Sequence, residues 1–351
     1  MSAIASLSAG MVKPSPGQMD LANKFGYLRS FGYNTHSFLS LYPAVKHFAL
    51  EGVDGYIPYV STNRLLLVSG EPVCSPAAFQ PLVNAMRAQA IARNLVLGML
   101  PVGEASKQRL ESMGFDVVYI GKEPIFDLKA LPKLTSSIRQ AVNRAQRRGL
   151  KVLPFDEKYR QAFESMCRQW QDTRQLPAMQ FLFQLRPLEL LEHKKYFLLT
   201  NESEELLAFL ACSPIYARNG WYLEDLIRDQ KAPNGGTELL VTAALDSLSA
   251  DGFDMATLAL APLAGLPGSD ETHPILNSIL RFCYRKLSFL YHFQTLEYFK
   301  AKFQPNTWEN NYFCFYPGGV TLNLVCNLIE AFMPFSLSEA FGRKVQEKTR
   351  A

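Results

Sequence analysis

The stretch Leu95-Val-Leu-Gly-Met-Leu-Pro-Val-Gly-Glu-Ala-Ser-Lys-Gln-Arg-Leu-Glu-Ser-Met-Gly-Phe-Asp-Val-Val-Tyr-Ile120 decides the fold. Residues 95–102 predict a buried strand, residues 104–113 a helix, and residues 115–120 a second strand. Residues 255–299 repeat this order of strand, loop, helix and strand with little sequence identity. Two copies of one α/β unit predict a central mixed sheet with helices on its faces.

The other elements follow from the same periodicities. Residues 55–60 and 65–69 predict a β-hairpin, and Ser75-Pro76 predicts a helix start, although Pro81 leaves that start open. In the second half we expect helices over 138–148, 157–170, 237–249 and 277–285, and strands over 196–200, 206–214, 221–225, 255–260 and 312–316.

The composition of the chain indicates a globular protein of two domains. The chain has 351 residues, of which 48% are hydrophobic and 19% charged, enough apolar residues for sizeable cores. The net charge of +4 is too small to establish a nucleic-acid partner. Six cysteines without a CxxC spacing indicate reduced, mostly buried thiols in a cytoplasmic protein.

No targeting or membrane-spanning segment is expected. Residues 1–20 lack the basic start and apolar core of a signal peptide. No apolar run reaches the ~18 residues that span a bilayer. The nearest candidate, Val320–Leu337, is interrupted by polar residues and Pro334.

The first segment that could carry chemistry is Trp221-Tyr-Leu-Glu-Asp-Leu-Ile-Arg-Asp229. It alternates as a strand and ends in charge, with Glu224, Asp225 and Arg228 where a central strand leaves the sheet. Charges at such a strand end suit a site at a sheet crevice. An Asp225–Arg228 surface ion pair is the equally good alternative.

The second segment is Lys231-Ala-Pro-Asn-Gly-Gly-Thr237, which precedes a predicted helix. The backbone N–H groups of Asn234, Gly235 and Gly236 could bind a phosphate or an oxyanion at the helix start. A plain turn and helix cap is the commoner meaning of an Asn-Gly-Gly sequence.

The third segment is Phe299-Lys-Ala-Lys-Phe-Gln-Pro-Asn-Thr-Trp308. Lys300 and Lys302, set among aromatic residues beside a proline turn, could hold a phosphate or a carbonyl oxygen. A solvated basic loop above packed aromatic residues is the alternative.

The fourth segment is a basic helix. Residues 128–155 hold seven basic residues and no acidic one. Clustered cations predict contacts to phosphates, whereas a solvated helix face is the alternative. The candidate contacts are Arg139, Arg144, Arg147, Arg148 and Lys151.

Other chemical signatures are absent from the sequence. None of the five histidines has a metal-ligand spacing. No GxSxG, P-loop or GxGxxG motif is present. We therefore expect neither a metal nor a cofactor, and we disfavour a serine hydrolase, a P-loop NTPase and a Rossmann dehydrogenase.

Several stretches, taken together, resemble one family in order and spacing. They are Gly32–Leu41, Ser69-Gly-Glu-Pro72, Ile138–Leu150, Glu224–Arg228, Ala261-Pro-Leu263 and Phe299–Trp308. The family is the C-terminal catalytic domain of the multiple peptide resistance factor proteins, which are aminoacyl-phosphatidylglycerol synthases of the phosphatidylglycerol lysyltransferase type. The resemblance covers roughly residues 25–317.

The resemblance implies an α/β fold of two tandem GNAT-like (acyl-CoA N-acyltransferase-like) domains with central mixed β-sheets. We place a flexible N-terminus at 1–20, an N-terminal domain at 21–135, a catalytic domain at 136–317 and an amphipathic helix with a tail at 318–351. The helix over 320–335 could lie on a membrane surface or dock on the protein. The expected localisation is cytoplasmic, with peripheral contact to the inner face of the membrane as an option.

The resemblance also implies the reaction and its residues. Aminoacyl-tRNA is the co-substrate, and a phospholipid head group or another small hydroxyl or amine is the acceptor. The family's Asp-Leu-Met-Arg motif falls on Asp225 and Arg228, with Ile227 in place of Met. Its Lys-x-Lys-Phe-x-Pro-x-Trp motif falls on Lys300 and Lys302, and it reaches Trp308 only with one extra residue.

These residues predict a division of roles. Asp225, with Glu224 beside it, orients or deprotonates the nucleophile or holds the amino group of the substrate. Arg228 and Lys302 contact phosphate or the oxyanion, and Lys300 and Trp308 bind substrate. A GNAT acetyltransferase that uses acetyl-CoA and a non-catalytic protein that binds tRNA or lipid are the alternatives. The amino acid and the acceptor stay open.

Overall fold

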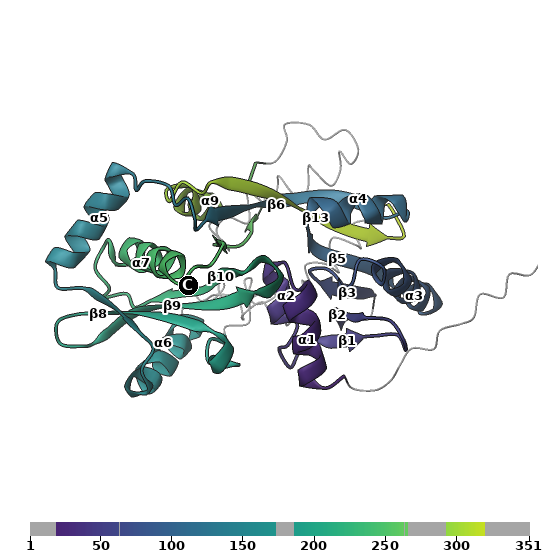
Figure 1. Ribbon diagram of the computed structural model, residues 1–351, viewed down its shortest axis with the longest axis horizontal. Helices are drawn as coiled ribbons and strands as arrows, with labels where there is room; N and C mark the ends of the chain where they lie inside the picture. The colour runs from purple at the N-terminus through teal and green to yellow at the C-terminus, as the bar shows by residue number, and fades with distance from the viewer. Residues whose placement is uncertain (1–18, 63, 173–185, 263, 266–292, 320–351) are drawn as a thin grey trace, which may run out of the picture.

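The computed structural model describes residues 19–62, 64–172, 186–262, 264–265 and 293–319 (Figure 1). The helices are α1 (Leu21–Phe31), α2 (Thr35–Leu39), α3 (Phe79–Ala92), α4 (Glu104–Ser112), α5 (Ser136–Arg147), α6 (Arg160–Asp172), α7 (Gly236–Ala250) and α9 (Phe293–Ala301). The strands of the N-terminal half are β1 (Lys46–Phe48), β2 (Gly55–Ser61), β3 (Leu65–Ser69), β4 (Val73–Cys74), β5 (Val96–Val102) and β6 (Asp116–Asp127). Those of the C-terminal half are β7 (Lys151–Pro154), β8 (Lys195–Thr200), β9 (Leu206–Ile215), β10 (Gly220–Arg228), β11 (Met255–Thr257), β12 (Ala261–Pro262) and β13 (Thr307–Tyr316).

One mixed sheet runs through both halves of the molecule. Its strand order is β1-β2-β3-β5-β13-β6-β11-β10-β9-β8-β7, with β4 and β12 attached to β2 and β6. The pairs β3–β5 and β10–β11 are parallel, and the other pairs are antiparallel. The mixed α/β class is confirmed, but the two halves of the chain share one sheet instead of each having its own.

Two α/β units of the structure exchange their last strands. The second unit differs from the predicted one, because residues 293–299, where a closing strand was expected, belong to helix α9, and the last strand is β13. The units are β5–α4–β6 and β11–α9–β13, yet β5 pairs with β13 and β11 pairs with β6. The strands β6 and β13 then pair with each other along most of their length. Figure 1 shows this ribbon of β6 (blue) and β13 (yellow) running from one half to the other. Each half therefore depends on the other for a strand of its sheet.

The N-terminal half has its core between the sheet and α3. Helix α3 buries one apolar face, which includes Leu82, Met86 and Ala90, against β2, β3 and β5. The helix begins at Phe79 and not at Ser75, so the predicted start was wrong. Ser75 instead accepts a hydrogen bond from the backbone N–H of Ala78 and starts a turn, which leaves Pro81 in the first helical turn where proline is tolerated.

The C-terminal half buries both faces of its sheet. Helices α5 and α7 cover one face, where Ile138 of α5 belongs to the same core as Leu199 and Leu223 of the sheet. Helix α6 covers the other face, where Phe163 stacks on Phe209 with ring centroids 3.7 Å apart. The all-buried pattern of β9 follows from this double cover.

The short helices α1 and α2 connect the two halves. Helix α1 contacts the turn Tyr216–Arg218 of the C-terminal half, and α2 contacts β9. Figure 1 shows both helices lying between the two groups of strands. The chain just after α2 therefore lies beside β9 and β10 of the other half.

Several predictions lie outside the described residues. They are the flexible N-terminus over residues 1–18, the helix over 277–285 and the amphipathic helix over 320–335. The domain boundary at 135/136 stays a prediction, and it coincides with Thr135, the residue that caps α5. Within the described ranges, no helix has the length and apolar character needed to span a bilayer.

Candidate active site

The parallel strands β10 and β11 separate soon after they meet. They pair only from Gly220 with Met255 to Tyr222 with Thr257. Strand β11 then ends, whereas β10 continues to Arg228 with β9 on its other side. Among the described residues, no strand pairs with β10 on the β11 side beyond Tyr222. Ligands of α/β sheets bind at such openings at the carboxyl ends of parallel strands.

A β-bulge occurs in β10 at this opening. Leu223 faces Cys212 of β9 and Asp225 faces Ala211, so Glu224 is the extra residue. Leu223 and Leu226 both contact the core under α7. Side chains of a regular strand alternate between the two faces of the sheet. Leu223 and Leu226 are three residues apart and yet share a face, so the alternation is shifted by one residue between them. Glu224 and Asp225 therefore both lie on the opposite face of the sheet, the face that α6 covers.

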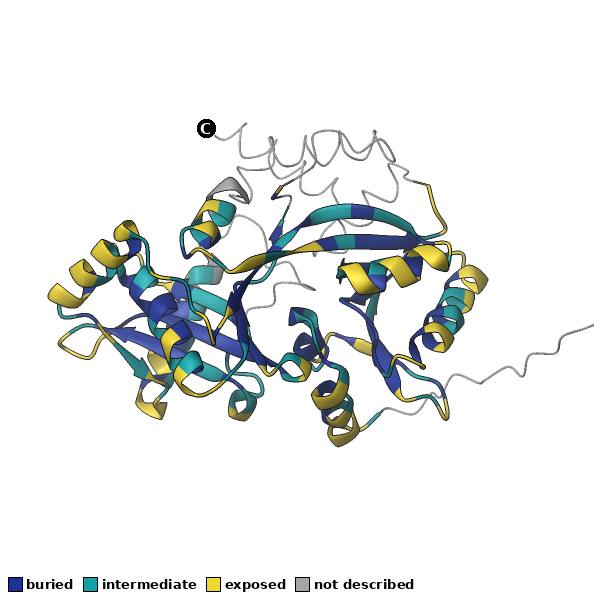
Figure 2. Cartoon of the chain, turned by 45° about the horizontal axis from the view of Figure 1, so that its top comes forward, coloured by how far each residue is buried: buried dark blue, intermediate teal, exposed yellow. Residues whose placement is uncertain are grey.

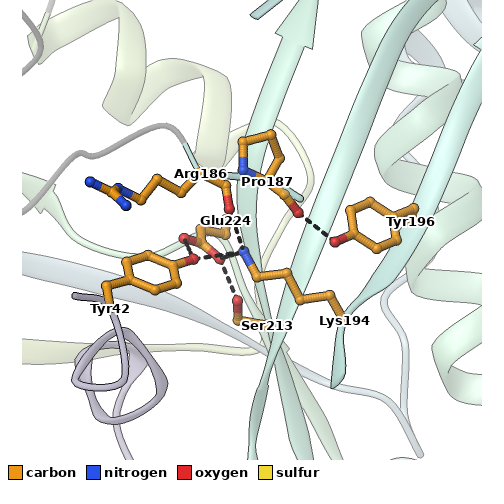
Figure 3. Close-up of polar contacts among 7 residues, drawn as sticks. All are labelled: Tyr42, Arg186, Pro187, Lys194, Tyr196, Ser213 and Glu224. Carbon is orange, nitrogen blue, oxygen red and sulfur yellow. Dashed lines mark hydrogen bonds and ion pairs between the residues drawn. The ribbon is translucent and has the colours of Figure 1, made fainter. Parts of the chain in front are cut away.

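Glu224 is fully satisfied at this position (Figure 3). Its Oε1 accepts a hydrogen bond from the Tyr42 hydroxyl at 3.0 Å. Its Oε2 accepts one from Lys194 Nζ at 3.1 Å and another from the Ser213 hydroxyl. The side chain of Lys194 is 0% exposed and that of Glu224 is 6% exposed. The cluster thus unites a residue of the N-terminal half with three residues of the C-terminal half.

Asp225, the next residue, is in the opposite situation. Its Oδ2 atom is buried and has no hydrogen-bond partner among the described residues. Burial raises the pKa of the Asp225 carboxyl well above its ordinary value, the charge of Glu224 raises this pKa further, and Lys194 lowers it. A buried carboxyl with a free oxygen and a raised pKa can accept and return a proton.

The structure divides the predicted strand-end cluster between two faces of the sheet. Arg228 faces Ala208, whose side chain belongs to the core under α5 and α7, and it is exposed. Asp225 faces Ala211 in the core under α6. Among the described residues these two form no ion pair. The alternative of a simple Asp225–Arg228 pair was therefore wrong, and the roles of both residues stay predictions.

Lys302 lies on the same face as Arg228. Its Nζ is 2.5 Å from Oε1 of Glu238 in the first turn of α7 and 4.3 Å from the ring centroid of Phe299. The side chain of Lys302 is 20% exposed. The Lys302 ammonium group is therefore held at the start of α7. A ligand that binds this group has to share it with Glu238 or replace Glu238.

Lys300 is buried and serves the loop after β11. Its Nζ donates to the carbonyl oxygens of Ala259 and Leu260 at 2.8 and 2.7 Å. Burial lowers the pKa of Lys300 to about 7, against the opposing effect of Glu123. These contacts explain the lysine structurally, and its predicted role in substrate binding stays a prediction. Trp308, the other predicted contact, has Lys122 Nζ 4.6 Å from its ring centroid.

The packing around the start of α7 explains the glycines at positions 235 and 236. Gly235 has φ +97°, and a Cβ atom there would lie 2.4 Å from the carbonyl oxygen of Ala141 in α5. A Cβ atom on Gly236 would lie 2.6 Å from Cδ2 of Leu199. Close approach of α5 and β8 therefore requires both glycines. The predicted helix start is confirmed, and anion binding by Asn234, Gly235 and Gly236 stays a prediction.

Helix α5 presents its cations to solvent. Thr135 caps the helix by accepting from the N–H of Ile138, and Ile138 and Ala145 are buried against the sheet. Figure 2 shows the outer side of α5 as exposed. The exposed cations have no salt bridge within the described ranges, and they are Arg139, Arg144, Arg147, Arg148 and Lys151.

Sequence reasoning missed three residues of the cluster, Tyr42, Lys194 and Ser213. Tyr42 comes from the other half of the chain, and no local pattern connects it with Glu224. The bulge had a visible signal, because Leu223 and Leu226 are three residues apart and break the alternation of a regular strand.

Comparison with known structures identifies relatives of the whole architecture. L-PGS from Bacillus licheniformis is 19% identical with a TM-score of 0.75, over 88% of this chain and 95% of that one. The C-terminal domain of a protein assigned as a lysylphosphatidylglycerol synthetase from Agrobacterium fabrum is 18% identical with a TM-score of 0.68, over 85% and 92% of the two chains. FemX is 12% identical with a TM-score of 0.54, over 89% and 99%. At these identities the likeness shows the fold.

The sequence comparisons supply the family. A search of curated proteins finds no match. The model described as phosphatidylglycerol lysyltransferase, C-terminal, matches residues 25–315, which is most of the chain. This range contains the bulge, the basic helix and the Phe299–Trp308 segment. The chain therefore belongs to the phosphatidylglycerol lysyltransferase C-terminal family, a family of aminoacyltransferases, as its motifs predicted.

Proposed function

We propose that this chain transfers the aminoacyl group of an aminoacyl-tRNA to the head group of phosphatidylglycerol at the carboxyl pair of β10. The observation that carries the proposal is the free, buried Oδ2 of Asp225 at the point where β10 loses its β11 partner. A family of aminoacyltransferases needs a proton acceptor for a hydroxyl nucleophile. The carboxyl group of Asp225 has a raised pKa, and its buried Oδ2 atom has no hydrogen-bond partner among the described residues.

The proposed reaction is a transesterification. A head-group hydroxyl attacks the carbonyl carbon of the aminoacyl ester, and a new C–O bond forms while the bond to the ribose oxygen of tRNA breaks. Ionised Asp225 takes the proton of the attacking hydroxyl and returns it to the departing ribose oxygen. The raised pKa of Asp225 suits both steps, because it makes the carboxylate a stronger base and the carboxyl a usable acid. The ester is already activated, so no other energy source is needed.

Cations on the opposite face of the sheet would serve the charged parts of the substrates. Arg228 is exposed at the end of β10, and Lys302 lies at the start of α7. We assign to them the phosphate of the lipid. The N–H group of Gly235 would add to this anion site, whereas that of Gly236 already donates to the carbonyl oxygen of Pro233 at 3.2 Å.

The basic helix α5 would bind the tRNA. Its exposed arginines lack acidic partners among the described residues, so their charge is available to phosphates. Helix α5 contacts α7, whose first turn holds Glu238 beside Lys302. An acceptor stem on α5 would therefore lie near the end of β10, where the ester must be placed.

The test is transfer of label from charged tRNA to lipid. The protein is incubated with tRNAs charged with different radiolabelled amino acids and with vesicles that contain phosphatidylglycerol or lack it. We expect label in the lipid phase only with phosphatidylglycerol present and with one amino acid or a few. Label that stays on tRNA in every mixture, together with calorimetric binding of acetyl-CoA, would favour the acetyltransferase alternative.

A further inference from the structure

Lys194 is a fully buried lysine whose contacts end at the proposed site. It lies just before β8, and its Nζ donates to Tyr42 Oη at 2.7 Å, to Glu224 Oε2 at 3.1 Å and to the carbonyl oxygen of Arg186 at 3.5 Å (Figure 3). These acceptors use the three N–H groups of an ammonium. Because Tyr42 also donates to Glu224, the lysine, the tyrosine and the carboxylate form a closed triangle.

The triangle gives the neighbouring carboxyl groups of Glu224 and Asp225 different numbers of hydrogen-bond partners. The bulge places Glu224 and Asp225 on one face, where two negative charges so close would oppose each other. Glu224 receives three hydrogen bonds, one of them from an ammonium, whereas Asp225 Oδ2 receives none from the described residues. The negative charge of the pair is therefore stabilised on Glu224.

We infer that Lys194 is a positioning residue that fixes Glu224 as the ionised member of the pair and thereby leaves Asp225 as the member that exchanges a proton. The inference rests on the proposed function only for the use of that proton. Tyr42 extends the arrangement to the N-terminal half, so the contact between the halves also sets the charge state of the site.

Among the described residues, Lys194 is the cation that contacts the pair. The titratable and charged groups on the neighbouring elements are Tyr42 after α2, Glu164, Cys167 and the exposed Arg168 on α6, Arg186, Glu189 and Glu192 before β8, Lys195 and Tyr196 on β8, and Cys212 on β9. Arg186 pairs with Glu189. Burial raises the pKa of Cys167 to about 12 and also raises that of Tyr196, so both stay neutral at physiological pH. Lys194 therefore determines the local charge balance.

Two variants separate this role from plain structural support. K194M removes the ammonium and keeps the length of the side chain, so the pair should hold its protons to higher pH than in the wild type. K194M/E224Q removes both charges. Because Glu224 raises the pKa of Asp225 more than Lys194 lowers it, Asp225 in the double variant should titrate at lower pH than in the wild type. K195M is the matched control, since neighbouring Lys195 pairs with Asp251 in a half-exposed salt bridge.

The readout is the infrared band of a protonated carboxyl group, followed against pH and assigned to Asp225 by its loss in D225N. We expect the midpoint to rise in K194M, to fall in K194M/E224Q and to stay unchanged in K195M. Equal midpoints in all four proteins, or a band lost in E224Q and kept in D225N, would overturn the inference. If K194M does not fold, the double variant, which has no unpaired buried charge, still gives the decisive shift.

The transfer assay supplies the second readout. The rate of K194M should fall about tenfold to hundredfold, because a small misplacement of the reacting groups costs this much, and the limb of its pH–rate profile that belongs to the pair should move to higher pH. An unmoved limb would contradict the inference. If the wild type transfers no label at all, the proposed function fails, while the infrared titration still tests the role of Lys194.

Discussion

The two parallel crossovers of the molecule have the same topology but differ at their open ends. Strands β3 and β5, joined by α3, pair over all five residues of β3, and Gly70 adds a further hydrogen bond to Leu100 at 2.7 Å. Strands β10 and β11, joined by α7, pair over three residues only, and β10 then bulges. In the N-terminal half the crossover is closed, because β5 pairs along the whole of β3. In the C-terminal half it is open, because β11 leaves most of β10 without a partner on that side among the described residues.

Each crossover also has a buried carboxyl group beyond its strand pairing. Glu71, just after β3, accepts from the backbone N–H of Gly103 at 2.7 Å and from the hydroxyls of Tyr33 and Ser106. Asp225 has no such partner for Oδ2 among the described residues. Burial raises the pKa of both groups. The difference in partners indicates that Glu71 holds the fold together, whereas Asp225 is available for chemistry.

The largest expected effect is the loss of activity in D225N. The amide keeps the size of the side chain but can neither accept nor return the proton, so the transfer rate should fall by about 10²–10⁴-fold. The free energy of unfolding should not decrease, because the amide has the size of the carboxyl group and no hydrogen bond from the described residues to Oδ2 is lost. Initial rates of label transfer and urea unfolding at neutral pH measure the two quantities. Near wild-type activity would remove Asp225 from the mechanism.

The next effect concerns tRNA affinity. R144A/R147A/R148A on α5 should weaken tRNA binding about tenfold to hundredfold, and the slope of log affinity against log salt should decrease by about 2, because each phosphate contact contributes roughly 0.7–0.9 to it. The control is R64A/R93A, which removes two exposed arginines of the N-terminal half. Filter binding over a salt series provides the data. Equal slopes in the two variants would show that α5 does not bind the tRNA.

The third effect is a loss of stability in E71Q. The amide cannot replace the charge-assisted bonds from Gly103 and the two hydroxyls, so unfolding should require about 1–3 kcal/mol less. Transfer by the folded protein should be unchanged. E111Q is the control, because Glu111 is exposed and forms only a 3.8 Å surface salt bridge, which is worth little. A stable E71Q with impaired transfer would reverse the roles of the two carboxyls.

The smallest effect, counted per pH unit, is the pH dependence that comes from Lys300, which holds the loop beyond β11 in place. Its pKa is about 7 in the folded protein and about 10.5 in the unfolded chain, where lysine is unperturbed. Between these values the unfolded chain binds the extra proton, so the stability that Lys300 contributes rises with pH, by up to about 1.4 kcal/mol per unit. Wild type should gain stability relative to K300M between pH 7 and pH 10. Parallel stability curves would mean that Lys300 keeps its proton.

The sequence was sufficient for the elements that depend on local periodicity. The hairpin of β2 and β3, the strand β5, the helix α4 and the basic helix α5 were predicted close to their observed bounds, whereas β6 and β10 continue to Asp127 and Arg228, past the predicted ends at Ile120 and Asp225. Each has a clear apolar period or a capping signal such as Thr135. Arg228 was also located at the strand end, whereas Glu224 and Asp225 lie at the bulge within β10 and not at its end.

The parts that escaped prediction depend on distant segments of the chain. The exchange of β6 and β13 could not be predicted, because several apolar strands have similar patterns. Which of them pair depends on the packing of the whole sheet. The faces of Asp225 and Arg228 depend on a bulge, which shifts the side chains by one position. Lys194 and Tyr42 have no local pattern, because their partner Glu224 is 30 and 182 residues away along the chain.

The most direct test of the account compares D225N and E71Q in one single-turnover experiment. Charged tRNA and phosphatidylglycerol vesicles are mixed with an excess of each protein, and the rate is normalised to the folded fraction. We predict that D225N loses transfer by about 10²-fold or more, while E71Q transfers at the wild-type rate. Equal losses in the two variants, or a greater loss in E71Q, would contradict the claim that the open crossover alone carries the chemistry.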